Sequence, residues 1–590
     1  MARRPKVTAR TPNLGAQTGA NFTLNTILSV DGFVPSFAHQ QLQQDVGKIF
    51  VLRGRNFDWD LRGPKSGYGN RRISRNTINV GELVSQPKIF RIKERTLLFA
   101  AGKVYRLAGN CADFEVEFEF PWRECGGHDE QHYPWSMAYV GQYYLFSHPY
   151  AGVIYYDELQ NVWGIHPLEG PCISSCIYGI TAAKNRLVVL TRDTVVYSEY
   201  DKPFSLLCSA YTGAGIQSLD EISKGIPYGV YPTRDGFVAY TSRGILSGRE
   251  LQTAILQSGD PGQMLYGTNL LPQPAFNVDW HADEIVPLGP NAIAQIAGFE
   301  QIILTKRGFF KIDGRRALGE LADQYAWETL IGVYFAEQEF RDNRSVDMRD
   351  IAAIRLEYDW QWGKLYVSLR DKHDLPYTRA LVYQFDFAKW GSFDFTHWCI
   401  GAMHFDRVEY NKRKSTGFIA YGGYACEFGL VASSAVRDRE FWPAIIDGPC
   451  EGKLHPLDSF IEIGPFRRTD FMYASRMTHF TEASLDMSSA VGESGDNYKN
   501  THRMADNWEE RAALEFPTNC KAYFGCSIDA YQIFEYNQQP MWLVDVDGRR
   551  RHYTFDNTGV SGTILLQASQ VGEYFHLHTI NVTAHLGGRY

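Results

Sequence analysis

The stretch NRLVVLTRDTVVYSEYDKPFSL, residues 185–206, decides the fold expected for this chain. It holds two apolar runs, one beginning at Leu187 and the other at Val195, around a polar break that contains turn formers. Because both runs are mostly β-branched or aromatic, the pattern predicts a strand, a tight turn and a second strand. Looser echoes begin at Thr233 and at Glu300. The recurrence predicts an architecture of serial hairpins.

The totals describe a globular chain that favours sheets. A length of 590 residues exceeds what one hydrophobic core usually serves, so more than one domain is expected. Aromatic residues make up 14% of the chain, which favours strands over helices. The formal net charge of -8 argues against a protein that grips nucleic acid by neutralising phosphates.

The cysteines and the N-terminus indicate a protein made in a cytoplasm. Ten cysteines are spread thinly over the chain, unlike the dense framework of a small disulfide-stapled domain, and we expect reduced, buried thiols. The first residues are basic but lack the apolar core of a signal peptide. No stretch approaches the roughly 20 apolar residues that a membrane helix requires.

Changes in polarity and hydrophobic periodicity along the chain divide it into four parts. Residues 1–45 are polar and weakly periodic, which predicts an extended N-terminal arm that a partner orders. Residues 46–84 form a connecting or platform segment, and residues 85–435 form a propeller-like domain of short strands. Residues 436–590 form a β-rich C-terminal platform or nozzle domain, a sandwich or a barrel, with an exposed polar insertion near 491–512.

The middle part carries the hairpin signal most clearly. Leu365, Val367 and Leu369 alternate with polar residues, as in a half-buried strand, and the Asp-Gly pairs at 235–236 and 313–314 suit tight turns. Serial antiparallel units of this kind predict an all-β fold with a β-propeller, and a large sandwich is the main rival. Helical periodicity is scarce, with its best candidates at 218–225 and 315–332.

One loop offers candidate metal ligands. The segment CGGHDEQHYPW supplies Cys125, His128, Asp129, Glu130 and His132, and the two histidines have the spacing of one helix face. It lies between Pro121 and Pro134, however, which opposes a helix and favours a polar loop without a metal. The pair Cys172 and Cys176 has the wrong spacing for a zinc knuckle and is interpreted as packed thiols.

No catalytic residue, cofactor ligand or metal ligand is assigned from the sequence. The glycines of TGAGIQS, residues 212–218, lack the Lys-Thr of a phosphate loop, and there is no G-x-S-x-G nucleophile elbow. Two segments are rich in arginine: residues 50–76, where Arg alternates with aromatic residues, and Arg549–Arg551. Residues 50–76 are interpreted either as an anion-binding patch or as an interdomain or subunit contact. Arg549–Arg551 are interpreted as an anion-binding patch, a subunit contact or a solvated hairpin tip.

The hairpin at 185–206, a strand reading R-L-V-V, a turn and then V-Y-S-E, resembles those of the tail tubular protein B or tail nozzle family of short-tailed bacteriophages. The end of the chain resembles the same family through SFIEIGPFRRTD, from Ser459, and GEYFHLHTINVTAHLGGRY, residues 572–590. Together the two regions span about two thirds of the chain. The long polar insertion at 491–512 departs from the pattern of the family's familiar members.

The resemblance implies a virion structural protein and no enzyme. It implies a homo-oligomeric ring, a hexamer, in the virion tail, assembled in the host cytoplasm and forming the conduit for genome ejection. Its partners would be an adaptor or head-to-tail connector protein and fibre or tip proteins, with genomic DNA passing without specific binding. The alternatives are a glycan-processing propeller enzyme, favoured by a deep axial pocket with two carboxylates and several arginines, and a carbohydrate- or protein-binding propeller.

Overall fold

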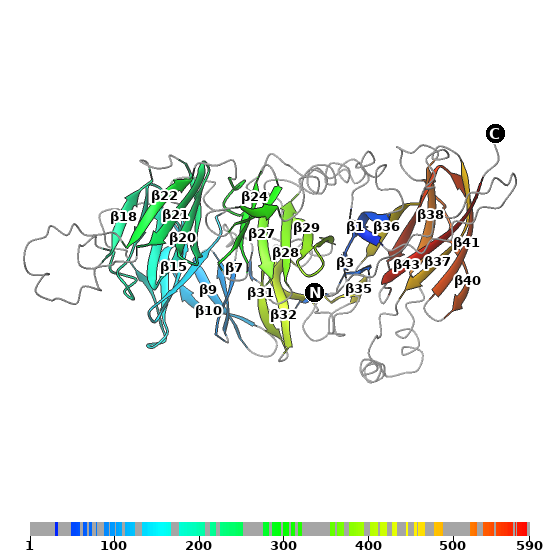
Figure 1. The fold of residues 1–590 in the computed structure, drawn as a ribbon. Helices are drawn as coiled ribbons and strands as arrows, with labels where there is room; N and C mark the ends of the chain where they lie inside the picture. The colour runs from blue at the N-terminus through cyan, green and yellow to red at the C-terminus, as the bar shows by residue number, and fades with distance from the viewer. Residues whose placement is uncertain are drawn as a thin grey trace, which may run out of the picture.

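The computed structural model is built from strands, grouped into a series of sheets at one end and a pair of stacked sheets at the other (Figure 1). No helix in the described part of the chain is long and apolar enough to cross a membrane. The residues that the structure describes are 30–33, 49–59, 63–67, 70–72, 78–79, 88–93, 95–100, 102–108, 113–123, 133–166, 176–206, 213–219, 225–251, 275–281, 286–296, 299–305, 308–312, 317–320, 354–359, 363–370, 377–394, 402–410, 413–421, 427–433, 444–446, 454–456, 458–466, 477–487, 520–527, 535–547, 550–569, 573 and 575–586.

Five sheets are each made of four strands that follow one another in the chain. Each sheet is antiparallel, and most of its neighbouring strands are joined by short turns, whereas longer connections link β17 to β18 and β21 to β22. Their strands are β7 (Lys88–Ile92), β8 (Arg95–Ala100), β9 (Lys103–Ala108) and β10 (Asp113–Glu119); β11 (Ser136–Val140), β12 (Tyr143–His148), β13 (Gly152–Asp157) and β14 (Val162–His166); β15 (Ile177–Ala183), β16 (Arg186–Thr191), β17 (Thr194–Tyr197) and β18 (Gly215–Ser218); β19 (Pro227–Thr233), β20 (Gly236–Thr241), β21 (Gly244–Glu250) and β22 (Phe276–His281); and β23 (Ile293–Gln295), β24 (Gln301–Thr305), β25 (Gly308–Ile312) and β26 (Ala317–Glu320).

Two further sheets combine strands from distant parts of the chain. The sixth adds strands from the segment after residue 56 to a local four-stranded unit, and the seventh adds its outer strands from residues 70–79 and 444–456. The sixth contains β27 (Arg355–Asp359), β28 (Lys364–Arg370), β29 (Tyr377–Gln384) and β30 (Lys389–Asp394), then β3 (Phe57–Trp59) and β4 (Pro64–Ser66). The seventh contains β31 (Ala402–Tyr410), β32 (Arg413–Tyr421) and β33 (Glu427–Ser433), then β5 (Asn70–Arg72), β6 (Ile78–Asn79), β34 (Ala444–Ile446) and β35 (Leu454–Pro456).

The first strands of these sheets lie against one another around an axis. Strand β11 contacts β15, β15 contacts β19, β23 contacts β27 and β27 contacts β31, and β31 returns to contact β7. A series of radial antiparallel sheets whose last member meets the first is a β-propeller. The seven sheets of the described residues are its blades, so the predicted all-β, propeller-containing fold is confirmed.

Successive blades share hydrophobic cores, and this explains why the stretch at 185–206 contains continuous apolar runs. In β16, Leu187 and Val189 pack with the preceding blade, whereas Val188 and Leu190 pack with the following blade. All four side chains are fully buried, because alternate positions of a strand point to opposite faces and both faces are covered. A propeller strand between two neighbours therefore has a continuous apolar run instead of strict alternation.

The C-terminal part is a sandwich of two sheets. One sheet has the order β1-β2-β36-β42-β38-β39 and the other β40-β41-β37-β43. Their inner faces meet in one core, where the Phe524 ring stacks on Phe555 and contacts Phe480. The strands are β1 (Val30–Phe33), β2 (Ile49–Arg55), β36 (Ser459–Phe466), β37 (Thr478–Met487), β38 (Lys521–Ser527), β39 (Glu535–Tyr536), β40 (Trp542–Asp547), β41 (Arg550–Gly559), β42 (Ser561–Ala568) and β43 (Leu577–Leu586).

The sandwich and the propeller share a hydrophobic core. The cluster that fills the sandwich continues through Val51 and Trp59 to Leu365 of the sixth blade. Ion pairs lie beside this core: Arg53 pairs with the buried Glu462, and Arg55 pairs with Asp458 at 3.0 Å. Residues 46–84, considered a connecting segment from the sequence, thus contribute β2 to the sandwich and β3–β6 to two blades.

The structure tests a helix and a turn that the sequence predicted. The helix proposed for 315–332 is wrong at its start, because Ala317–Glu320 is strand β26, which pairs with β25. The turn predicted at Asp235-Gly236 exists, although its two central residues are Arg234 and Asp235. Most of the arm at 1–45, the insertion at 491–512 and the turn at 313–316 lie outside the described residues.

Gly236 gives a test of this packing. A side chain on Gly236 would overlap the carbonyl oxygen of Gly248 on the adjoining strand, and backbone cannot move aside as a flexible side chain can. Gly236→Val should therefore lower the melting temperature, with a cost of about 1–3 kcal/mol. Gly363→Asn is the control, because nothing lies within 4 Å of its added Cβ and Asn tolerates a φ of +59°. Equal melting temperatures for both variants in a thermal unfolding scan would contradict this arrangement.

Candidate functional site

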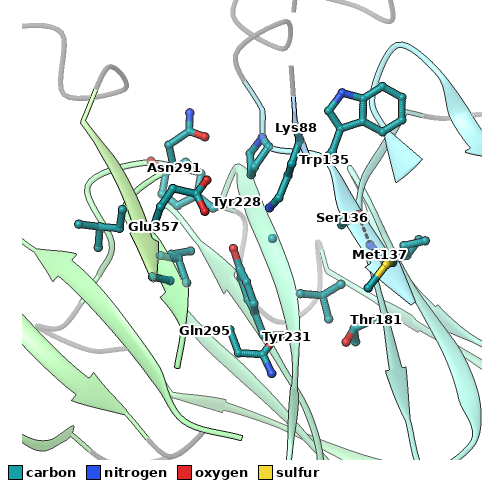
Figure 2. Close-up of a pocket in the computed structure, with 18 of the residues that line it drawn as sticks. Lys88, Trp135, Ser136, Met137, Thr181, Tyr228, Tyr231, Asn291, Gln295 and Glu357 are labelled. Atoms are coloured by element: carbon teal, nitrogen blue, oxygen red, sulfur yellow. Dashed lines mark hydrogen bonds between the residues drawn. The ribbon is translucent and has the colours of Figure 1, made fainter. Parts of the chain in front are cut away.

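The propeller axis contains a cavity of about 250 Å³ that is partly open to solvent. The first strands of six blades line it: β7, β11, β15, β19, β23 and β27 (Figure 2). Side chains from six separate hairpins therefore converge on one volume, although they are scattered over 270 positions of the sequence, from Lys88 to Tyr358. Such a convergence is the usual location of a binding site in a ring-shaped fold.

Local backbone features bring the strands close together at the axis. The pairing of β15 with β16 shifts register between Ile177 and Gly179, and that of β19 with β20 shifts between Pro227 and Gly229. A Cβ on Gly179 would lie 3.3 Å from the backbone nitrogen of Val230, so glycine permits the close approach of β15 and β19. These irregularities explain why glycines recur in the first strands of hairpins.

A charged pair lies in the wall contributed by β27. The Arg355 guanidinium donates to Oε1 of Glu357 through Nε at 2.8 Å and Nη2 at 2.7 Å. Arg355 is only 1% exposed, so the ion pair holds a full charge in a place that water barely reaches. Removing either partner would leave a buried charge with less compensation.

Tyrosines stand opposite this pair. Burial raises the pKa of Tyr231, and the negative charge of Glu357 raises it further. Burial also raises the pKa of Tyr228. Both phenols therefore stay neutral at physiological pH and can donate hydrogen bonds. Figure 2 shows Glu357, Tyr231 and Lys88 pointing toward the same volume.

This arrangement suits hydrogen bonding better than carboxylate-pair catalysis. Among the described lining residues Glu357 is the one carboxylate, and it is engaged with Arg355. Hydrolysis of glycosides usually needs two carboxyl groups, one of them protonated. The inner strand of the seventh blade, β31, has side chains outside the described set. No group of three or more His, Cys, Asp or Glu residues in the described ranges could hold a metal ion.

The candidate residues of the sequence lie elsewhere. The loop Cys125–His132 and Cys172 fall outside the described residues. The expectation that all cysteines are free is wrong for Cys176, which is disulfide-bonded. Cys520 and Cys526 are free, and burial raises the pKa of each thiol to about 12, which makes them poor nucleophiles.

The arginine-rich segments are partly internal. Arg53 pairs with Glu462 of β36 and Arg55 pairs with Asp458 just before it. Because β2 and β36 are neighbours in one sandwich sheet, these two pairs lie within the sandwich and not between domains. Arg551 is buried in the sandwich, so the idea of a solvated hairpin tip is wrong for this residue. Arg550, its neighbour, is exposed. The hairpin itself exists, since β40 pairs with β41 up to Asp547 and Arg550.

Sequence reasoning missed Arg355, Glu357 and Tyr231. RLEYD, residues 355–359, looks like an ordinary strand, and nothing in its residue types shows that it faces an axis. The available signal was its position: it is the first strand of a hairpin unit, and first strands line the axis of a propeller. An arginine in that position needs a partner, which Glu357 supplies two residues later on the same face.

Comparisons with known proteins do not assign this chain to a family. No protein-family model and no curated protein matches this chain. Solved structures similar to it include the β-propeller domain of Cps50 (Swd1) from Myceliophteria thermophila, 9% identical with a TM-score of 0.34, covering 62% of this chain and 100% of that one. The Pan2 WD40 domain of Neurospora crassa is 8% identical with a TM-score of 0.33, covering 64% and 97%.

The axial ion pair can be tested with a double-mutant cycle. Glu357→Leu alone leaves the Arg355 charge buried without this partner and should cost about 3–5 kcal/mol. Arg355→Met combined with Glu357→Leu should recover most of the loss, because both charges go together. Glu115→Leu, in the exposed pair with Arg106 at 2.9 Å, is the matched control and should change little. If the losses in the free energy of urea unfolding for Arg355→Met and Glu357→Leu simply add in the double variant, the two side chains are not coupled and this account is contradicted.

Proposed function

We propose that this chain is a structural subunit of a bacteriophage tail, a nozzle or tubular ring protein that forms the conduit for genome ejection and has no catalytic turnover. The sequence resemblance at 185–206 and in the C-terminal strands supports this proposal. So does the architecture, because the resembled family combines a propeller with a β-rich body and this chain joins a propeller to a sandwich through one core. The ring is proposed to be a hexamer located in the virion tail.

The observation that carries the proposal is an exposed apolar strand at the sandwich edge. Trp542, Leu543 and Val544 of β40 are 76%, 40% and 59% exposed. Within the described residues β40 pairs with β41 alone, so its other edge presents unpaired backbone groups. Folded chains usually protect such an edge with charges or cover it with another strand. A second copy of this chain in the ring is the occupant that the proposal assigns to it.

The shape of the molecule fits a lateral contact at this strand. Strand β40 lies at the end of the sandwich that is remote from the propeller (Figure 1). A ring needs a heterologous contact, in which one patch meets a different patch of the next copy, and a free strand edge supplies one half of it. The net charge of -8 suits a conduit that lets DNA slide past its walls.

Other tail proteins are proposed to contact the remaining surfaces. The insertion at 491–512 connects β37 to β38 at the sandwich, where a fibre or tip protein would bind it. Within the arm at 1–45, Val30–Phe33 is strand β1 of the sandwich, and the rest would attach to the adaptor ring above or to a neighbouring subunit. Both segments are polar, and such segments gain order on binding.

Substitutions in β40 test the assembly. Trp542→Lys with Val544→Lys places two charges on the proposed contact, and exposed positions tolerate such changes with little effect on folding. The wild-type chain should form a closed oligomer at high concentration in analytical ultracentrifugation, and the double variant should remain monomeric. Leu159→Lys, an equally exposed apolar position of the second blade, should assemble like the wild type.

Two results would contradict the proposal. One is a wild-type chain that remains monomeric at every concentration and in the presence of tail particles. The other is a double variant that assembles as well as the wild type, which would place the subunit contact elsewhere.

A further inference from the structure

A second hollow, which we name the blade-turn groove, lies between the second and third blades. It is open to solvent, has a volume of about 940 Å³, and is lined by Tyr139, Gly141, Gln142, Tyr143, Asn185, Asp201, Lys202, Pro203, Phe204 and Ser205. The β11–β12 turn forms one wall, and the β15–β16 turn with residues 201–205 forms the other. All of its lining residues belong to the described chain, and none lines the axial cavity.

The two walls are held in place by backbone contacts. The Asp201 amide donates to the Asn185 carbonyl oxygen at 2.8 Å, and Glu199 and Ser205 are joined by a backbone hydrogen bond of 2.9 Å. A Cβ on Gly141 would lie 3.0 Å from the Asp201 carbonyl oxygen, so the opposite turns touch. A groove with fixed walls binds a ligand without a large ordering cost.

Aromatic rings form part of the surface. Phe204 is stacked on His166 with ring centroids 4.0 Å apart, and the Tyr143 ring meets it at 4.8 Å. Tyr139 is 45% exposed, and its hydroxyl donates to Glu158 at 3.0 Å, which fixes the ring. Rings anchored in this way offer apolar surface at an otherwise polar site.

The polar groups of the groove are mainly acceptors. The Gln142 side-chain amide donates to Asp157 at 3.0 Å and that of Asn185 donates to Tyr200 at 2.9 Å, which leaves their carbonyl oxygens available. The Asp201 carboxylate makes no hydrogen bond or ion pair in the described structure. The charged lining residues are Asp201 and Lys202, and the Lys202 ammonium group pairs with the Glu199 carboxylate at 2.9 Å.

We propose that the blade-turn groove binds a neutral saccharide chain. A sugar ring presents C–H groups that pack on aromatic rings and hydroxyl groups that donate to carbonyl and carboxylate oxygens, which matches the two kinds of surface found here. The Lys202 ammonium group in the lining repels a basic peptide, the other ligand that acceptor oxygens attract, and so favours an uncharged ligand. This inference does not depend on the proposed ring assembly.

The test uses the full chain on a printed array of neutral oligosaccharides built from glucose, galactose, mannose and rhamnose, with titration calorimetry on those retained. Asp201→Gly and Asn185→Gly each remove one acceptor, and glycine keeps the positive φ of 55° and 56° at these positions. Each should weaken binding by about tenfold. Ala388→Gly, at φ 53° in a turn of the sixth blade, is the matched control and should bind like the wild type.

The array and the titrations distinguish saccharide binding from cation binding and from no binding. Retention of at least one neutral oligosaccharide, weakened by both groove variants and unchanged by Ala388→Gly, supports the inference. Retention of none at millimolar concentration, or equal binding by Asp201→Gly, would overturn it. Binding of hexalysine in place of the oligosaccharides would overturn it as well, because it would identify the groove as a cation site. Melting temperatures of all variants check that the fold is intact.

Discussion

The N-terminal segment closes the circle of propeller blades, and the rest of the structure depends on this closure. The outer strand of the seventh blade, β5, pairs with β33 so that Arg72 lies opposite Val431 and Asn70 opposite Ser433. Bringing together residues more than 350 positions apart carries an entropic cost, but this cost grows only slowly with loop length and is met once. The seventh blade can then hold β31 against β7, which completes the ring.

The same segment also fixes the sandwich to the propeller. Before reaching β5 the chain contributes β2 to the sandwich and β3 and β4 to the sixth blade. Buried Val51 and Trp59 lie in the core that both bodies share. The propeller and the sandwich are therefore joined rigidly where they share this core. A rigid connection suits a subunit that transmits load between its neighbours in the proposed tail ring.

Local structure was readable in the sequence, and non-local structure was not. The hairpin at 185–206 follows from its own β-branched runs, and the all-β propeller follows from repetition of that pattern. The strands at 57–59 and 70–72 are short, and the pairs that join them to their blades, Phe57 with Ser392 and Arg72 with Val431, are far apart in the chain, so no local pattern marks their place. The axial cavity was missed for the same reason, because Arg355 and Tyr231 are far apart in the chain and line one cavity only once the blades surround a common axis.

Hydrogen exchange at the closing strand tests the central claim most directly. In the intact chain, peptides covering residues 70–72 and 427–433 should exchange slowly and should lose protection together as denaturant is added, because β5 and β33 share one ladder of hydrogen bonds. Rapid exchange at 70–72 beside a protected 427–433 would show that the N-terminal segment does not close the ring, and the account of one joined block would fail with it.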